Sequence, residues 1–247
     1  MRAMILAAGL GTRLRPLTND RPKALVEVAG HTLLEITLRR LRQFGVRDVI
    51  VNVHHFADLV VDFLKKHNSF GMRVEISREE ILLDTGGGLK KAAWFFSDSD
   101  EPFILHNVDV ISTIDFNGMV KAHRGSGALA TLAVQLRETS RYLLFDEADQ
   151  LCGRRAGPTG AAEMVRQARE TTAMAFSGVH VISPRMLSLI EEQGVFSIIT
   201  AYLKLAAVGE RISAFRVDEF YWRDLGRPEN VRQAGLDVEQ GIIQLER

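Results

Sequence analysis

A glycine-rich turn directly after a short apolar run is the feature that most constrains this chain. Residues Ala3–Ala8 read Ala-Met-Ile-Leu-Ala-Ala, which suits a strand covered on both faces. Gly9 and Gly11 follow, and glycines let the backbone approach a bulky anion and point consecutive N–H groups at it. A strand that runs into such a turn therefore predicts a phosphate site at the edge of an α/β sheet.

Four cations reinforce this prediction. Arg13, Arg15, Arg21 and Lys23 follow the turn within fifteen residues of the strand and supply the charge that a polyphosphate needs neutralised. The alternative is a tight strand–helix turn with solvated arginines. That alternative accounts for the glycines but not for four cations gathered around Pro22.

Two familiar phosphate loops do not fit this segment. The dinucleotide fingerprint needs a third glycine where Leu14 stands. The Walker-type loop ends in Gly-Lys-Ser/Thr, whereas Gly11 is followed here by Thr12 and Arg13. The turn is therefore expected to belong to a third kind of phosphate-binding loop.

Composition indicates a compact enzyme. With 247 residues, 46% hydrophobic and 25% charged, the chain fits one α/β domain over residues 1–247. A formal net charge of zero argues against general attraction to nucleic acid or a membrane surface. The single cysteine, Cys152, excludes an internal disulfide, and no apolar run approaches the roughly 20 residues of a membrane span. We expect a cytoplasmic protein.

Apolar strands alternate with amphipathic helices along the chain, which predicts a mostly parallel sheet with helices on both faces. Ligands of such sheets bind beyond the carboxyl ends of the strands. The irregular segment from Asp146 to Thr172 is expected to be a loop, and a mobile flap is one interpretation. Helices are predicted at about 34–44, 57–66, 87–96, 115–124, 184–193 and 196–207, and strands at about 48–53, 72–77, 102–105, 128–136, 174–182 and 211–217.

Two aspartates are candidate metal ligands. Asp109 follows a buried strand, and Asp224 precedes Gly226 near the C-terminus. Magnesium prefers one or two carboxylates together with waters and substrate phosphate oxygens, so two aspartates from distant strand ends are a sufficient protein contribution. The plainer interpretations are a helix N-cap for Asp109 and a turn residue for Asp224.

A third candidate segment is Asp84-Thr-Gly86-Gly87-Gly88. A helix is expected to begin there, and its opening glycines would leave backbone N–H groups free beside a ligand. A glycine-rich helix cap without a ligand is the alternative, and the two roles are compatible.

The residues Leu6-Ala-Ala-Gly-Leu-Gly-Thr-Arg-Leu-Arg-Pro-Leu-Thr18, followed by Arg21-Pro-Lys23, resemble the signature of the sugar-1-phosphate nucleotidylyltransferases. The resemblance continues through Asp84–Gly88, Asn107–Asp109, Phe176–Val179 and Asp224–Gly226. It implies a three-layer, Rossmann-like (GT-A-like) nucleotidyltransferase fold with a mixed, mostly parallel central sheet. The implied reaction joins a nucleoside triphosphate to a sugar 1-phosphate and releases pyrophosphate, with Mg²⁺ as cofactor.

The same resemblance implies a role for each matching residue. Arg13, Lys23 and Asp109 would be catalytic, and Asp109 and Asp224 would hold the metal. Asn107, Gly178 and Asp224 would contact the sugar phosphate. The implied nucleotide-binding residues are Leu6, Ala7, Ala8, Gly9, Gly11, Thr12, Arg13, Lys23, Glu80, Gly86 and Gly87.

Two departures from the family pattern bear on function. Val108 stands where the family usually has glycine, and a side chain there could crowd the nucleotide. The Glu-Lys-Pro element of many relatives is replaced by a loop around Gly153–Pro158. With Thr-Gly-Gly-Gly and no trailing hexapeptide repeats, the chain looks most like the N-acetylmuramate-1-phosphate uridylyltransferases of cell-wall recycling.

Other interpretations stay open at this point. A heptose- or mannose-1-phosphate guanylyl-, adenylyl- or cytidylyltransferase is one, and a non-catalytic regulatory protein that binds nucleotide sugars is another. Composition does not determine which nucleobase or which sugar the enzyme uses. The chain is expected to act as a monomer or homodimer.

Overall fold

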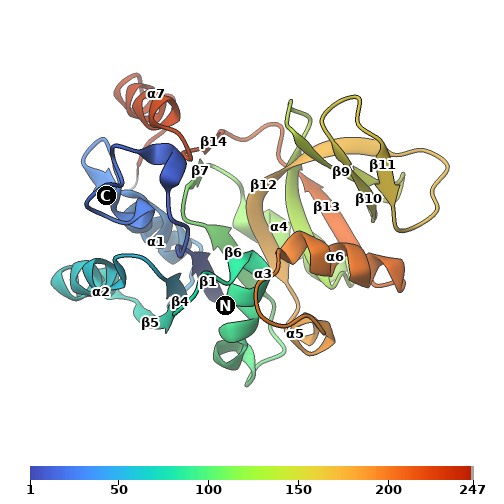
Figure 1. Ribbon diagram of the computed structural model, residues 1–247, viewed down its shortest axis with the longest axis horizontal. Helices are drawn as coiled ribbons and strands as arrows, with labels where there is room; N and C mark the ends of the chain where they lie inside the picture. The colour runs from blue at the N-terminus through green and yellow to red at the C-terminus, as the bar shows by residue number, and fades with distance from the viewer. Residues whose placement is uncertain (246–247) are drawn as a thin grey trace.

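The computed structural model describes residues 1–245, so the last two residues of the expected domain lie outside it. A ten-stranded sheet runs through the molecule in the order β11-β10-β9-β12-β6-β1-β4-β5, and β8 pairs with β12 and β13 off this path (Figure 1). The strands of this sheet are β1 (Arg2–Leu6), β4 (Asp48–Val53), β5 (Arg73–Arg78), β6 (Phe103–Asn107), β8 (Ala130–Gln135), β9 (Arg141–Phe145), β10 (Leu151–Ala156), β11 (Ala162–Met164), β12 (Thr172–Ile182) and β13 (Ile212–Arg216).

The N-terminal half of the sheet is parallel. β1 lies between β4 and β6, and β4 pairs in turn with β5, all in the same direction. Ala3, Met4 and Ile5 of β1 are completely buried. Ala3 and Ile5 belong to one hydrophobic core and Met4 to a second, because successive side chains of a strand point to opposite faces. The sequence prediction of a strand covered on both faces is confirmed.

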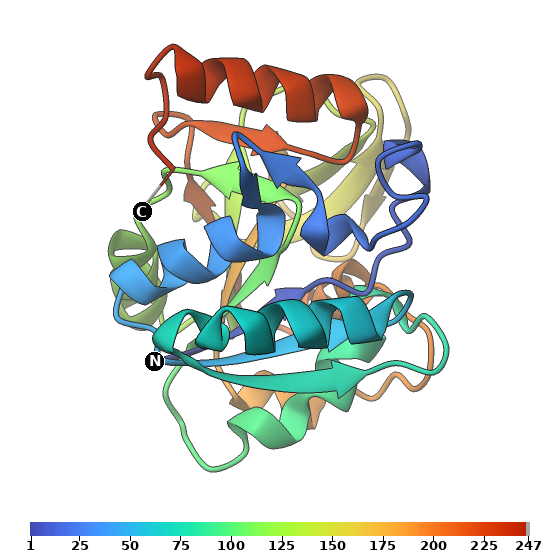
Figure 2. The ribbon, with the colours of Figure 1, turned by 90° about the vertical axis from the view of Figure 1, so that its left-hand side faces the viewer.

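Helices cover both faces and complete three layers. Leu34, Leu38 and Leu41 of α1 (Leu33–Gln43) pack in the first core with residues of α2 (Ala57–Lys66), α4 (Phe116–Ser126) and α7 (Pro228–Glu239). Figure 2 shows α1, α2 and α7 together on the side that faces the viewer. The second core contains residues of α3 (Asp84–Lys91), α5 (Arg185–Leu189) and α6 (Ile198–Ala207). The expected mixed sheet with flanking helices is confirmed.

The C-terminal half of the sheet is largely antiparallel. β12 pairs antiparallel with β6, β8 and β9, and β9 continues through β10 to β11. Only β13 runs parallel to its partner β8 among the pairs of this half that the structure describes. The expectation of an irregular loop over 146–172 is therefore wrong in part, since β10 and β11 extend the sheet within that segment.

A small antiparallel ladder lies beside the main sheet. It joins β7 (Val110–Ser112) to β14 (Trp222–Asp224), and α7 follows directly. The sequence patterns missed these two strands, β9, the β2–β3 ladder (Glu27–Val28 and His31–Thr32) and α7. Two predicted helices also differ: α3 begins at Asp84 rather than near 87, and α5 ends at Leu189 rather than near 193.

None of the helices within residues 1–245 has the length and apolar content that crossing a membrane requires.

Candidate active site

The loop after β1 is shaped around Gly11. This residue has φ +64°, which favours glycine, and a Cβ there would lie 3.0 Å from Cγ2 of Thr18. The Thr18 hydroxyl donates a hydrogen bond of 2.8 Å to the Gly11 carbonyl. Thr12–Leu14 forms a short 3₁₀ turn, and the fully buried Leu14 packs in the first hydrophobic core and fixes the loop there.

Gly9 has no such structural reason to be glycine. A Cβ at this position would meet no protein atom within 4 Å, and the residue is exposed. Packing of the described chain therefore does not account for it. Open space beside an exposed loop backbone is what close approach of a ligand requires.

Lys23 and Asp109 are brought together from segments 86 residues apart. The Lys23 ammonium donates to the Asp109 carboxylate, and both side chains are largely buried, with 14% and 13% exposed. Lys23 lies in the short 3₁₀ turn Lys23–Leu25, and Asp109 lies between β6 and β7. The N-cap interpretation of Asp109 is not what the structure shows, because this residue begins no helix.

Asp109 and Asp224 are neighbours through the β7–β14 ladder. Asp224 stands opposite Val110 in this ladder, and the Leu225 N–H donates a 2.7 Å hydrogen bond to the Asp109 carbonyl. Asp224 also has the turn role considered above, since one of its carboxylate oxygens accepts from the Gly226 N–H at 2.6 Å. The ladder thus brings the backbones of Asp109 and Asp224, from distant parts of the chain, together at one edge of the sheet.

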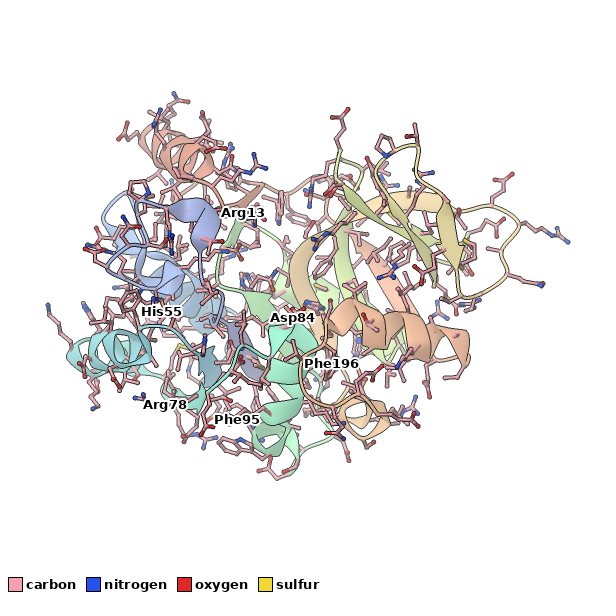
Figure 3. The ribbon with its side chains drawn as sticks, in the orientation of Figure 1. Arg13, His55, Arg78, Asp84, Phe95 and Phe196 are labelled. Carbon is pink, nitrogen blue, oxygen red and sulfur yellow. The ribbon has the colours of Figure 1, made fainter. Side chains whose placement is uncertain are left out.

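Arg13 reaches the same edge. A Cβ on Gly226, two residues after Asp224, would lie 2.9 Å from Nη2 of Arg13. Figure 3 shows Arg13 projecting from the N-terminal loop, and the residue lines a large cleft together with Asp224. Arg13, Lys23, Asp109 and Asp224 therefore lie at one edge of the sheet, although Lys23 and Asp109 are not among the residues that line the cleft.

The cleft has a volume of about 1430 Å³ and lies between the loop–ladder edge and the β9–β11 part of the sheet. Asn107 and Gly178 both line it. Gly178 has φ +78°, and a Cβ there would lie 3.0 Å from Nδ2 of Asn107. The antiparallel β6–β12 register places the two residues side by side. Three of the residues expected on the sugar-phosphate side, Asn107, Gly178 and Asp224, thus share one wall.

The expectation of free N–H groups at Gly86 and Gly87 is wrong. Both donate to the carbonyl of Phe196, at 2.9 and 3.2 Å. A Cβ on Gly86 would collide with the Phe196 ring, and one on Gly87 would collide with the Gly194 carbonyl. Figure 3 shows Asp84, at the start of α3, and Phe196 close together. These buried glycines thus serve close packing of α3 against the 194–198 segment, which is the helix-cap alternative.

The expected crowding by Val108 is likewise not found. Its side chain is 2% exposed and packs in the first core, and its N–H donates to the Leu6 carbonyl at 3.1 Å. A side chain that lies in the core leaves the cleft clear.

The sequence patterns missed a buried polar network behind the loop. The Asn52 side chain accepts from the Ala7 N–H at 2.7 Å and donates to the Glu79 carboxylate at 2.6 Å. The other Glu79 oxygen accepts from the Leu83 N–H at 2.9 Å. Asn52 inside the apolar run 49–53 was the available signal, because a polar side chain in a buried strand needs partners. Glu80, which follows Glu79 in the chain and was the predicted base-side residue, is exposed.

No histidine or cysteine is among the described residues that line the cleft. Burial lowers the pKa of His106 to about 4 and that of His180 to about 3, so both rings are neutral near pH 7. Burial also raises the pKa of the Cys152 thiol, which keeps it protonated and unreactive. Among residues 1–245 no group of three or more His, Cys, Asp or Glu side chains is placed to hold a metal ion.

The fold and the site define a nucleotide-transferring class of enzyme, and comparison with known proteins agrees. The family model described as nucleotidyl transferase matches residues 2–241, so the chain belongs to that family. It is 36% identical over 234 residues to the N-acetylmuramate alpha-1-phosphate uridylyltransferase of Caulobacter vibrioides, and the match covers 92% of each chain. The expected enzyme class, a sugar-1-phosphate nucleotidylyltransferase, is confirmed.

Other relatives differ in length or only share the fold. The mannose-1-phosphate guanyltransferase of Candida albicans is 30% identical over 93% of this chain, which spans 62% of that longer relative. HddC from Yersinia pseudotuberculosis, solved with GMP-PN, superposes with a TM-score of 0.75 at 24% identity, covering 96% of this chain and 98% of its own. The inositol-1-phosphate CTP transferase of T. maritima gives 0.73 at 19% identity, with 97% and 96% covered.

Proposed function

We propose that this enzyme transfers the uridylyl group of UTP to N-acetylmuramate 1-phosphate, giving UDP-N-acetylmuramate and pyrophosphate. The observation that carries the reaction is the convergence of Arg13, Lys23, Asp109 and Asp224 at one edge of the sheet. The choice of substrates rests on the Caulobacter relative, whose whole length this chain nearly spans.

Charge repulsion is the main obstacle to this reaction. A triphosphate and a sugar phosphate bring several negative charges together, whereas the attacking phosphate oxygen is already ionised near pH 7. That oxygen forms a bond to the α-phosphorus while the bond from this phosphorus to the bridging oxygen of pyrophosphate breaks. No general base or covalent intermediate is needed, so catalysis consists of positioning and electrostatic stabilisation.

Each cationic side chain then has a task. Arg13 binds the β- and γ-phosphates, and Lys23 neutralises the phosphates around the reacting α-phosphorus. The loop of Gly9 and Gly11 receives the triphosphate with its backbone N–H groups. Asn107, beside Gly178 in the cleft wall, hydrogen-bonds the sugar.

Asp109 and Asp224 fit a magnesium ion. Their backbones are adjacent through the β7–β14 ladder, and carboxylate oxygens are the ligand type that Mg²⁺ prefers. One or two carboxylates would suffice where substrate phosphates complete the coordination. The ion supplies neutralisation of phosphate oxygens when bound.

A matrix of triphosphates and sugar 1-phosphates tests the substrates. Pyrophosphate release is measured for four nucleoside triphosphates against the 1-phosphates of N-acetylmuramate, N-acetylglucosamine, mannose and a heptose. The highest kcat/KM is expected for UTP with N-acetylmuramate 1-phosphate. A guanylyl, adenylyl or cytidylyl preference would replace this assignment, and binding without pyrophosphate release in every pairing would favour a regulatory protein.

Two substitutions test the catalytic roles. Lys23→Ala and Asp109→Ala are each expected to lower kcat by about 10²–10³-fold or more, the scale of losing one preorganised electrostatic contact. Circular dichroism and thermal unfolding check that the variants fold. Lys121→Ala, on the exposed face of α4, is the matched control and should keep full activity. Near-normal turnover in either test variant would refute the assignment.

A further inference from the structure

The cleft carries an excess of positive charge. Seven arginines line it against four carboxylates, which leaves an excess of three positive charges. The arginines are Arg13, Arg137, Arg141, Arg154, Arg155, Arg223 and Arg227, and the carboxylates are Glu138, Glu163, Asp224 and Glu229. Arg13 belongs to the loop after β1, whereas the other six lie on elements outside that loop.

Several of these arginines have partners of their own. Arg223 binds the carboxylate of Asp237 at 2.7 Å, and Arg154 binds that of Glu163 at 2.7 Å. Arg227 lies 3.7 Å from a Glu229 oxygen. Arg141 is exposed. Arg137 and Arg155 remain, both half-buried and without an ion pair among the described residues.

The guanidinium of Arg137 is held in place by neutral groups. It lies 4.0 Å from the centre of the Trp222 ring, and Nη2 donates to the Phe176 carbonyl at 2.8 Å. Its buried Nε has no hydrogen-bond partner. Burial lowers the pKa of Arg137, while the charge of Asp224 and the nearby Tyr142 oppose this shift. A guanidinium that lines the cleft, is held in place by neutral groups and has no carboxylate partner in an ion pair is suited to bind an anion.

Arg155 shows the same features on the far side of Tyr142. Its guanidinium carbon lies 5.4 Å from the centre of the Tyr142 ring, and its buried Nε also lacks a partner. Arg155 stands opposite Tyr142 in the β9–β10 ladder, two strands beyond the strand that carries Gly178. Along the cleft wall, Asp224, Arg137, Tyr142 and Arg155 therefore lead away from the reacting end.

We propose that Arg137 and Arg155 bind a carboxylate carried by the sugar, so that the enzyme selects acidic sugar 1-phosphates over neutral ones. The proposal rests on the proposed function and assigns the specificity of the same cleft. The carboxylate of N-acetylmuramate, on the lactyl ether remote from the 1-phosphate, is a group of this kind. A buried cation without a counter-ion is unfavourable, and an anionic substituent that pairs with it gains a charge-assisted hydrogen bond.

Two substrates that differ in this one group test the proposal. N-acetylglucosamine 1-phosphate lacks the lactyl ether and is otherwise the same sugar phosphate. The wild-type kcat/KM is expected to be at least about 10-fold higher for N-acetylmuramate 1-phosphate, because a site built for a polar group rejects the analogue that lacks it. Equal use of both substrates would overturn the proposal.

The variants then locate the preference. Arg155→Gln and Arg137→Gln are each expected to lower kcat/KM about 10-fold or more for the acidic substrate, and less than about 3-fold for the neutral one. Arg155→Lys keeps the charge and is expected to fall between wild type and Arg155→Gln. Arg185→Gln, on α5 outside the cleft, is the control. Equal losses on both substrates would show a merely structural role and overturn the inference.

One further measurement separates this inference from the proposed reaction. If no sugar 1-phosphate supports pyrophosphate release, the proposed function fails. Calorimetric binding of the two sugar phosphates then decides the inference alone. Tighter binding of the acidic compound that Arg155→Gln abolishes supports it, and equal binding overturns it.

Discussion

Lys23 and Asp109 show how single residues acquire a role that only their neighbourhood explains. Each is a common surface residue type, yet both are largely buried and each is the other's partner. The motif around residues 9–25 predicted Lys23, and the strand end predicted Asp109. Their contact required the fold. Glu79, by contrast, was not predicted by any motif, because nothing in the local sequence distinguishes it from the exposed Glu80. Only its hydrogen bonds to Asn52 and Leu83 identify it as a structural residue.

A matched pair of glycine substitutions separates ligand approach from backbone strain. Gly9→Ala is expected to leave the free energy of unfolding within about 0.5 kcal/mol of wild type, because a Cβ there meets no protein atom within 4 Å. It should nevertheless raise KM for the triphosphate about 10-fold. Gly11→Ala is expected to cost about 1–2 kcal/mol, since its φ of +64° disfavours a side chain. Urea unfolding and steady-state kinetics measure both.

The two variants test different properties of the loop, KM for the triphosphate with Gly9→Ala and stability with Gly11→Ala. If Gly9→Ala leaves KM unchanged, the loop does not approach the triphosphate at that residue. If Gly11→Ala unfolds at the wild-type urea midpoint, the loop backbone relaxes more easily than its Thr18 contact indicates.

At the scale of elements, the β7–β14 ladder places Asp224 beside Asp109. β14 is short, and α7 contacts it through Asp237, whose side chain is buried with 3% exposed. This carboxylate accepts from the Tyr221 hydroxyl at 2.6 Å and from Nη2 of Arg223 at 2.7 Å. Asp237 is therefore a positioning residue for Asp224, although it lies outside the cleft.

Asp237→Asn tests this support. Removing the charge from a buried ion pair is expected to lower the free energy of unfolding by about 2–3 kcal/mol. It should also weaken magnesium binding, seen as a rise in the Mg²⁺ concentration for half-maximal activity. Asp98→Asn, which removes an exposed partner of Arg2, is the control and should change stability by at most about 1 kcal/mol. A variant that loses stability but keeps its Mg²⁺ requirement would show that α7 supports folding alone.

At the scale of the whole molecule, neutral histidines in the centre of the sheet make stability depend on pH. His106 of β6 and His180 of β12 are 3% and 1% exposed, and burial lowers their pKa values to about 4 and about 3. The unfolded chain takes up these protons near its ordinary pKa of about 6.5. The stability is therefore complete above that pH and falls as the pH drops toward 3–4.

The size of this effect can be measured by urea unfolding between pH 7 and pH 5. Each buried histidine is expected to reduce the free energy of unfolding by about 2 kcal/mol over that range, as the linkage of 1.36 kcal/mol per pKa unit requires. His180→Gln should reduce the slope of the free energy of unfolding against pH by the contribution of one histidine. The lost hydrogen bond to the Tyr202 hydroxyl should lower stability at every pH. A slope that stays the same in the variant would show that His180 is protonated in the folded state.

The sequence by itself determined the glycine-rich loop after β1, the β1 strand buried on both faces, the parallel half of the sheet and the family. These features depend on local pattern, since a glycine turn or an apolar run has the same meaning wherever it folds. Only the tertiary structure decided the rest. It turned the predicted flap into β10 and β11, buried Val108 and closed the Gly86 and Gly87 N–H groups onto Phe196. It also placed Asp109 beside Asp224, because contacts between residues more than a hundred positions apart depend on how the whole sheet is ordered.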